Sequence, residues 1–360
     1  MRTHTERKDR RQPTKTSAES LPKKSLTSRL VKPLRWMLTT FKFFIRFVPL
    51  IWATAAIYWS NLPWRWARLV LALAFLAFGI YALWVKPNLR TLLVFAGLFL
   101  VVFVWYLSIR PSNNRNWRPE VAVMPRAVID GDRVLLKNIR NFDYRTKDDF
   151  TVRYEDREVL LSDLTSVDFF VSYWMPGPVA HTFVSFNFDN AAPVSISIEA
   201  RPEVGRGFEP FASIFKQFGL IYVVADERDV VRVRTNFRGE NLYLYRVQTS
   251  PEKARKLFLV YLDRINQLAD RPEFYQLLSN SCTINIVRYA RMTGKLPEFD
   301  IRFWLNGFSD RGLYRARLLN PALPFAELRR RSWVDDAARA ADDAADFSRR
   351  IRASLPIGRP

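Results

Sequence analysis

Residues 274–289 read FYQLLSNSCTINIVRY and contain Cys282, the only cysteine among 360 residues. Ser279, Asn280 and Ser281 are residue types that favour the N-cap of a helix, and the segment 284–289 is helix-like. A helix that begins there places Cys282 in its first turn. The unpaired N–H groups of a helix N-terminus carry about half a positive charge, which favours a thiolate and can stabilise an oxyanion. The alternative is a small thiol that packs in the core, since free cysteine is often buried.

A catalytic Cys-His pair has one possible composition in this chain. The two histidines are His4, which lies in a charged N-terminal tail, and His181, which opens a predicted strand after a Pro/Gly turn. The pair can therefore only join Cys282 to His181, unless His181 is a structural histidine held by hydrogen bonds. A working base needs a group that orients its second ring nitrogen, and Glu199 on the neighbouring strand is the best candidate. The alternative for Glu199 is an ordinary ion pair with a nearby arginine.

The charge of the chain points to a membrane. The net charge is +21, yet residues 1–40 hold eleven Lys and Arg against three acidic residues, and residues 41–110 hold seven with no acidic residue. Most of the excess therefore flanks apolar segments, where cations meet anionic lipid headgroups. We expect no nucleic-acid partner. One cysteine excludes an intrachain disulfide and disfavours a structural zinc site.

Residues 37–110 are predicted to form a membrane anchor of about three transmembrane helices. The stretches 43–62, 67–85 and 91–109 are apolar, and 19 residues make about 28 Å of helix, enough to cross the hydrocarbon layer. Residues 1–36 are predicted to be a disordered, basic, cytoplasmic tail. Three spans place the rest of the chain in the periplasm of a multi-pass inner-membrane protein, whereas two spans reverse this orientation.

Residues 111–330 are predicted to be an α+β domain, followed by a C-terminal helix and tail at 331–360. Ser250 and Pro251 predict a helix start, and the apolar stripe that follows predicts a buried face. A hairpin is expected from strands at 181–189 and 194–200. Further strands are expected at 134–136, 150–154, 168–174, 220–225, 230–235 and 242–247. Common phosphate-binding, zinc-protease and serine-hydrolase motifs are absent, so we expect no cofactor and no metal.

Several blocks of this chain resemble the N-terminal periplasmic domain of the Lnb-type lipoprotein N-acyltransferases. The resemblance covers roughly 113–350 and rests on Asn113–Trp117, Arg140–Phe142, Ala180–Thr182, Ser195–Arg201, Phe274–Tyr275 and Asn280–Thr283. It implies a fold similar to the permuted papain-like (NlpC/P60-like) group, in which the histidine precedes the cysteine. It also implies that Cys282 is the nucleophile and His181 the base, with Arg201 and Asn280 binding substrate. The role of Glu199 as the third catalytic residue, beside Cys282 and His181, is inferred from its position on the neighbouring strand.

These observations together predict a membrane-anchored thiol acyltransferase or acyl hydrolase acting on lipid or lipoprotein acyl groups. A cysteine peptidase or amidase of the cell wall is the alternative among enzymes. A non-catalytic envelope scaffold that binds lipid or a partner is the alternative outside them. An accessible thiol of low pKa near His181 favours an enzyme, and an apolar groove favours acyl chemistry over peptide chemistry.

Overall fold

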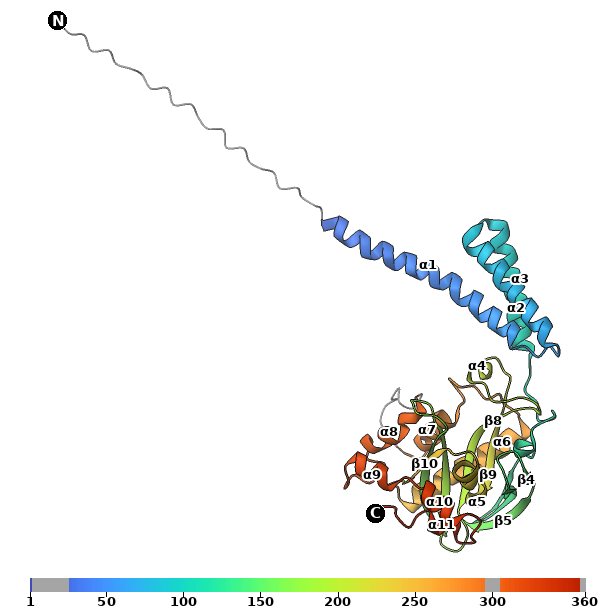
Figure 1. Cartoon of the computed structure of the whole chain (residues 1–360), viewed down its shortest axis with the longest axis vertical. Helices are drawn as coiled ribbons and strands as arrows, with labels where there is room; N and C mark the ends of the chain where they lie inside the picture. Colours follow the sequence, from blue (N-terminus) through green and yellow to red (C-terminus); the bar gives the residue numbers. More distant parts are fainter. Residues whose placement is uncertain (2–25, 295–304, 357–360) are drawn as a thin grey trace.

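Three apolar helices stand apart from a globular domain (Figure 1). The structure is a computed structural model that describes Met1, residues 26–294 and residues 305–356. Most of the tail that we expect to be disordered, at 2–25, lies outside these residues.

The three helices have the length and composition that a membrane span requires. They are α1 (Leu26–Tyr58), α2 (Arg65–Ile80), which continues into the π-turn η1 (Tyr81–Val85), and α3 (Leu89–Ser108). The candidate spans within them are Arg35–Tyr58, Arg65–Val85 and Leu89–Ser108. The prediction of three apolar helices is confirmed, but α1 begins at Leu26, so 26–36 is helical and not part of a disordered tail.

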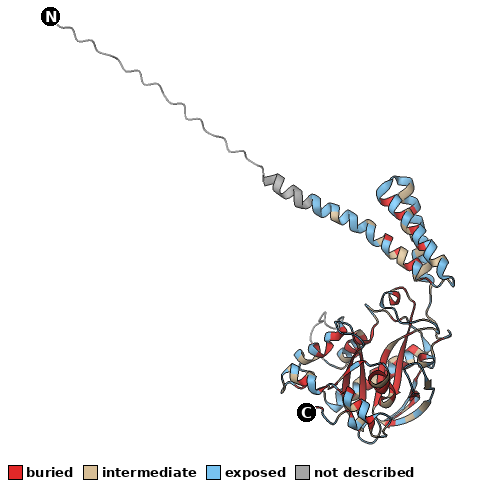
Figure 2. Ribbon diagram, in the orientation of Figure 1, coloured by how far each residue is buried: buried red, intermediate tan, exposed pale blue. Residues whose placement is uncertain are grey.

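The helices pack on one another and leave most of their surface exposed (Figure 2). Gly79 of α2 allows close approach, because a Cβ there would lie 2.3 Å from Leu50 of α1 and 3.2 Å from Phe95 of α3. Small or absent side chains at such contacts let helix backbones approach closely in a membrane. The apolar residues that face outward suit contact with lipid.

One mixed sheet forms the centre of the globular domain. Its strands run in the order β1-β2-β9-β8-β7-β6-β10, with β5 also paired to β2. The strands are β1 (Arg126–Asp130), β2 (Arg133–Arg140), β5 (Tyr154–Leu160), β6 (Leu164–Tyr173), β7 (His181–Phe188), β8 (Val194–Arg201), β9 (Gly219–Asp226) and β10 (Asn241–Arg246). A separate pair joins β3 (Asp143–Tyr144) to β4 (Phe150–Thr151). The predicted β7–β8 hairpin is confirmed.

Helices cover both faces of this sheet. On one face α6 (Pro251–Asp270) and α7 (Cys282–Met292) bury apolar side chains against Val184, Ile196 and Ile198. The other face is covered by α5 (Glu227–Val230), the π-turn η3 (Val233–Phe237), α10 (Asp335–Ala341) and α11 (Phe347–Arg350). The remaining short helices are η2 (Pro119–Val121), α4 (Pro210–Ser213), η5 (Asn306–Phe308), α8 (Ser309–Arg315) and α9 (Phe325–Arg331). The predicted α+β class is confirmed.

The start of α6 follows the sequence prediction closely. The Ser250 side chain accepts a hydrogen bond from the Lys253 N–H at 3.3 Å, and Pro251 occupies the first turn. The apolar stripe of the helix is buried, apart from Leu257, which is partly buried. Capping and periodicity, both local signals, were sufficient here.

Three predictions were wrong because tertiary packing overrides local preference. The predicted strand 230–235 is helical: Asp226 accepts a hydrogen bond from the Arg228 N–H and caps α5, and the valines that follow are buried. The segment 150–154 is not one strand: it contains the two-residue strand β4 and the first residue of β5. The expected C-terminal helix splits into α10 and α11 at Asp342, where φ is +42°. Both short helices pack into the core.

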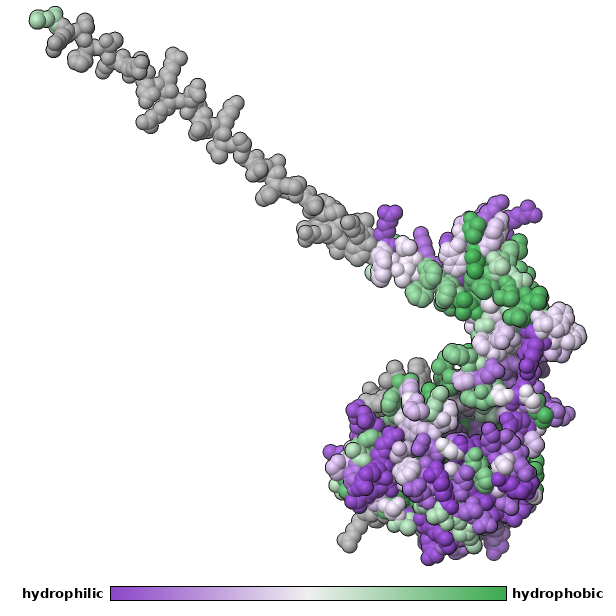
Figure 3. Space-filling model, viewed as in Figure 1, coloured by the Kyte–Doolittle hydropathy of each residue, from purple (hydrophilic) through white to green (hydrophobic). Residues whose placement is uncertain are grey.

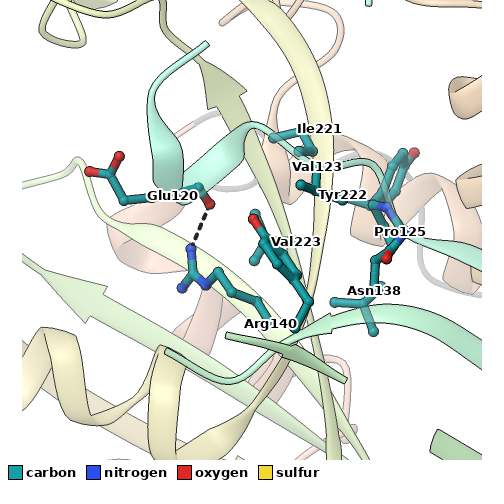
Figure 4. A pocket seen from close by; sticks show the side chains of 10 residues that line it. Glu120, Val123, Pro125, Asn138, Arg140, Ile221, Tyr222 and Val223 are labelled. Atoms are coloured by element: carbon teal, nitrogen blue, oxygen red, sulfur yellow. Dashed lines mark hydrogen bonds between the residues drawn. The ribbon is translucent and has the colours of Figure 1, made fainter. Parts of the chain in front are cut away.

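A buried ion pair joins β2 to α5. Arg140 donates to both carboxylate oxygens of Asp229, at 2.7 to 3.2 Å, and Asp229 also accepts from the N–H of Phe142 at 2.7 Å. The guanidinium also donates to the Glu120 carbonyl (Figure 4). Both side chains are at most 5% exposed. Loss of one partner would leave the other charge buried and unpaired.

We expect Asp229→Asn to destabilise the domain by about 3–5 kcal/mol, because the Arg140 charge would stay buried without a counter-charge. Asp149→Asn is the matched control, since Asp149 pairs with Arg145 at an exposed site. Thermal unfolding of the detergent-solubilised protein measures both. Equal melting temperatures for the two variants would show that the buried pair contributes nothing.

Candidate functional site

Cys282 is the first residue of α7, and Ser281 is its N-cap. The loop before it is held by Asn280, whose side-chain amide donates to Glu273 at 3.0 Å and to the Phe274 carbonyl at 3.1 Å. The Asn280 side chain in turn accepts a hydrogen bond from Asn285, one turn into the helix. The helix start that the sequence predicted is present, but Cys282 is only 2% exposed and packs in the core cluster, so it is not the accessible thiol expected of an enzyme.

The thiol lies where two strands of the sheet separate. Strand β7 stays paired to β6 as far as Ser172 with His181, and β8 stays paired to β9 as far as Arg201 with Gly219. The pairing between β7 and β8, however, ends at Phe183 with Ser197. The backbone at Thr182 is therefore released from β8, and it lies close enough to Cys282 to lower the pKa of the thiol.

The surroundings of the thiol favour its ionised form. Burial opposes ionisation, but His181, through its charge and a side-chain hydrogen bond, and Thr182, through hydrogen bonds, lower the pKa of Cys282 to about 6. A free thiol has a pKa near 8.5. A thiol with this shift is largely thiolate at neutral pH, which is the form that acts as a nucleophile.

A chain of polar contacts begins at His181 and runs across the face of the sheet that lies opposite α7. The His181 Nε2 lies 2.7 Å from Ser197 Oγ, and Ser197 Oγ donates to Glu199 Oε1 at 2.8 Å. Glu199 also accepts from Arg234 of η3 at 2.8 Å. Glu199 lies near His181 as predicted, but at 3.8 Å with Ser197 between them.

The carboxylate at the end of this chain is kept ionised. Burial works against the charge of Glu199, but Arg234, His181, Arg140 and the Ser197 hydrogen bond together hold its pKa well below the usual range. A permanent negative charge near the imidazole stabilises the imidazolium that forms when the ring accepts a proton. Arg234 is itself 4% exposed and stacks over Phe183 at 5.0 Å.

Two further side chains lie close to Cys282, and the sequence alone predicted no role for either of them. Tyr275 is buried, which raises its pKa, and the neighbouring Cys282 raises that pKa further through its charge. Asn306 points its Nδ2 at the sulfur at 3.8 Å, and its Oδ1 accepts from the Ala180 N–H at 3.0 Å. No local motif marks Asn306, because it comes to the site only through tertiary contacts.

Asn306 is positioned by its neighbour Gly307. The Gly307 N–H donates to the Pro178 carbonyl at 2.9 Å, and the hydroxyl of Tyr173 donates to the Gly307 carbonyl at 2.6 Å. A Cβ at Gly307 would lie 2.7 Å from the Pro178 backbone, so only glycine permits this approach. The Pro/Gly turn before His181 and the Asn306 loop therefore form one unit.

Arg201 does not face the site, contrary to its predicted role in substrate binding. It is 2% exposed, stacks on Trp117 at 4.5 Å, and donates to Asn113 and to the carbonyls of Val121 and Ala122. Its donors are thus used to fix the segment that leaves the membrane helices. Asn280, the second predicted substrate residue, uses its side chain to shape the cysteine loop.

An apolar cavity of about 150 Å³ lies beside α7. Its wall includes Ile286, one turn beyond Cys282, together with Val184 of β7 and Leu257 of α6. Among the residues that the structure describes, no three His, Cys, Asp or Glu side chains are close enough together to hold a metal ion.

We expect alkylation of Cys282 by iodoacetamide to rise with pH through a midpoint near 6, because the thiol ionises at the lowered pKa. In His181→Ala the midpoint should move up toward that of a free thiol, since the His181 imidazole is the main group that lowers the pKa of Cys282. All label reports Cys282, as no other cysteine exists. Overlapping pH profiles of the two proteins would contradict this.

Comparison with known proteins agrees with the sequence resemblance. Residues 150–307 match the family model described as the Lnb N-terminal periplasmic domain. This range is narrower than the roughly 113–350 suggested by the sequence blocks, and it contains His181, Glu199, Cys282 and Asn306. No curated protein and no solved structure matches the chain.

The family match and the three apolar helices together describe a membrane-anchored envelope protein with a periplasmic domain. Residues 150–307, somewhat less than half of this chain, are thus similar to the Lnb N-terminal periplasmic domain.

Proposed function

We propose that the domain is a thiol-dependent acyltransferase or acyl hydrolase whose nucleophile is Cys282 and whose base is His181. One observation carries the proposal: a buried thiol at a helix N-terminus whose pKa is lowered to about 6 beside an imidazole. Perturbed thiols of this kind cluster at functional sites. Ser197 and Glu199 are positioning residues, because their hydrogen bonds orient the imidazole ring of His181.

The proposed first step is attack of the Cys282 thiolate on an ester carbonyl of a lipid or lipoprotein. The S–C bond forms, the ester C–O bond breaks, and the imidazolium of His181 gives its proton to the departing alcohol. The products are a thioester on Cys282 and a lyso-lipid. In the second step His181 takes a proton from an amine or a water molecule, which attacks the thioester and restores the thiol.

The negative oxygen formed in both steps requires donors. The N–H of Cys282 lies near the Tyr275 hydroxyl, and the Asn306 amide Nδ2 lies 3.8 Å from the sulfur. Together with the start of α7 these groups form the proposed oxyanion site. A permuted papain-like arrangement is consistent with this layout and remains part of the proposal.

Acyl chemistry is favoured over peptide chemistry by two features. The cavity beside α7 is lined mainly by aliphatic side chains, which suit an alkyl chain better than a polar peptide. The domain also follows directly after a span that ends at Ser108, so it lies close to a lipid surface. A cell-wall amidase is the second candidate, because the same Cys-His chemistry cleaves amides.

The lipid substrate and the orientation of the anchor belong together. We propose a multi-pass inner-membrane protein with its basic tail in the cytoplasm and the domain outside. Three spans place the residues before them and the residues after them on opposite sides of the membrane. A phosphatase reporter fused after Pro360 should then be active, and a fluorescent reporter that matures only in the cytoplasm should stay dark. The reverse pattern means two spans and a cytoplasmic domain.

The acyl-enzyme is the most direct test. Detergent-extracted protein incubated with phospholipid should gain the mass of one fatty-acyl group, and neutral hydroxylamine should remove it, because thioesters are cleaved under conditions that spare oxygen esters. Cys282→Ala should gain nothing. His181→Ala should lose most of the modification while keeping the melting temperature of the wild type. Intact-mass spectrometry measures each.

The same experiment separates the two enzyme candidates. If Cys282 stays unmodified with phospholipid and with diacylated lipopeptide, while the protein releases peptides from muropeptides in a Cys282-dependent way, the amidase replaces the acyltransferase. Absence of both activities, with a normally folded protein, leaves the scaffold as the function.

A further inference from the structure

We propose that the loop between β8 and β9 is a lipid-contact loop that inserts apolar side chains into the bilayer in which the three helices are embedded. We define the lipid-contact loop as residues 203–218, which include the short helix α4. The loop contacts the headgroups and the upper acyl chains of the leaflet that faces the domain. The proposal goes beyond the chemistry of Cys282 and does not depend on it.

The loop exposes large apolar side chains in a part of the domain that faces the helices. Phe211 is 69% exposed, Val204 53% and Phe208 43%, and Leu278 of the cysteine loop is 58% exposed. In Figure 3 the domain is mostly hydrophilic, while apolar surface gathers on the helices and on the end of the domain beneath them. Exposed apolar groups of this size mark contact sites.

The loop is attached to the end of α1. The ring of Trp59 stacks on Phe215 at 5.3 Å, and its indole N–H donates to Glu209 at 3.3 Å. The side-chain amide of Gln217 donates to the Trp59 carbonyl. Because α1 is a candidate span that ends at Tyr58, these contacts hold the loop where the hydrocarbon layer ends.

A second attachment reaches the end of α3. The hydroxyl of Tyr106 donates to the Ile214 carbonyl at 3.2 Å, and Lys216 donates to the carbonyls of Tyr106 and Ile109. The ends of two candidate spans thus fix the position of the lipid-contact loop relative to the membrane. Figure 1 shows α4 directly beneath the helices.

The residue types around the loop are those of a membrane interface. Trp64, the N-cap of α2, and Trp66, in its first turn, are 60% and 68% exposed, and tryptophan gathers at the headgroup level. Arg65 and Arg110 are exposed at the same helix ends, where they suit anionic headgroups. Between residues 35 and 110 the sequence contains no acidic residue that would repel them.

A lipid surface fits these features better than a second protein chain. The apolar side chains continue a surface that already carries three candidate spans, and they are ringed by tryptophan and arginine. Amphipathic segments of this composition lie in the interface plane and bury their apolar side to shallow depth.

The position of the loop links this surface to the cysteine. Phe208 packs edge-on against Tyr275 at 5.9 Å, and the Phe218 carbonyl accepts from the Tyr275 N–H at 3.0 Å. Tyr275 contacts Cys282. A molecule that leaves the bilayer at the lipid-contact loop therefore meets the cysteine loop next.

The chain offers a clean test, because Cys282→Ser removes its one cysteine. In that background Phe211→Cys, Phe208→Cys and Val152→Cys are labelled with an environment-sensitive fluorophore, in full-length protein in nanodiscs of phosphatidylethanolamine and phosphatidylglycerol. Val152 is the matched control: it is 52% exposed and directly follows β4 of the separate β3–β4 pair, outside the lipid-contact loop.

We expect blue-shifted emission from positions 211 and 208, and loss of that emission when lipids with a spin label near the headgroup are included. Position 152 should emit as in water and lose nothing. Equal emission at 211 and 152 overturns the proposal. Blue-shifted emission at position 211 that the spin-labelled lipids fail to quench also overturns the proposal, because protein and not lipid then covers the loop.

These readings are independent of catalysis. The protein lacks its thiol throughout, so failure of the acyl-enzyme experiment leaves the quenching result intact, and the reverse also holds. Two loop positions guard against a single substitution that disturbs folding.

Discussion

The arrangement of the domain depends on the contact between the start of α7 and the gap between β7 and β8. A sheet normally satisfies its own N–H groups, and here the pairing of these strands stops at Phe183 with Ser197. The backbone at Thr182 then lies next to a sulfur that α7 brings from the other layer, and it lowers the pKa of that thiol. The helix terminus, the released backbone and the imidazole all favour negative charge at one buried point. Without the gap, the imidazole and the thiol would lie on opposite faces of a continuous sheet.

The carboxylate of Glu199 is partly buried beside the imidazole of His181, and this charge requires compensation, which explains the arginines on the second face of the sheet. Arg234 pairs with Glu199, and Arg140 pairs with Asp229 close enough to lower the pKa of Glu199 as well. Buried charges are costly unless they are paired and hydrogen-bonded. The polar chain from His181 therefore depends on the same ionic network that fastens α5 and η3 to the sheet. Fold and site share these residues, so a substitution in the network is expected to alter both.

Local signals in the sequence were sufficient for the elements but not for the details of the site. The cap at Ser250, the apolar spans and the single cysteine at a helix start follow from short-range patterns that act wherever they occur. Strand alternation placed Glu199 on the face of Ser197, yet it could not show that Ser197 would stand between the carboxylate and His181. Arg201 was misread because an arginine on a polar face resembles a ligand until its burial is known. Asn306 lies 24 residues from Cys282, and no spacing rule connects them.

The link between anchor and site follows from the order of the contacts. The ends of α1 and α3 hold Phe215, Ile214 and Lys216; the chain then enters β9 at Gly219, which bridges to Phe274. The next residue, Tyr275, touches the thiol. A shift of the helices relative to the domain must therefore pass through the segment that sets the position of the Cys282 N–H. Packed interiors transmit such displacements because they contain little free space. Geometry at the nucleophile is thus tied to the geometry of the anchor, and an isolated domain without its helices lacks that constraint.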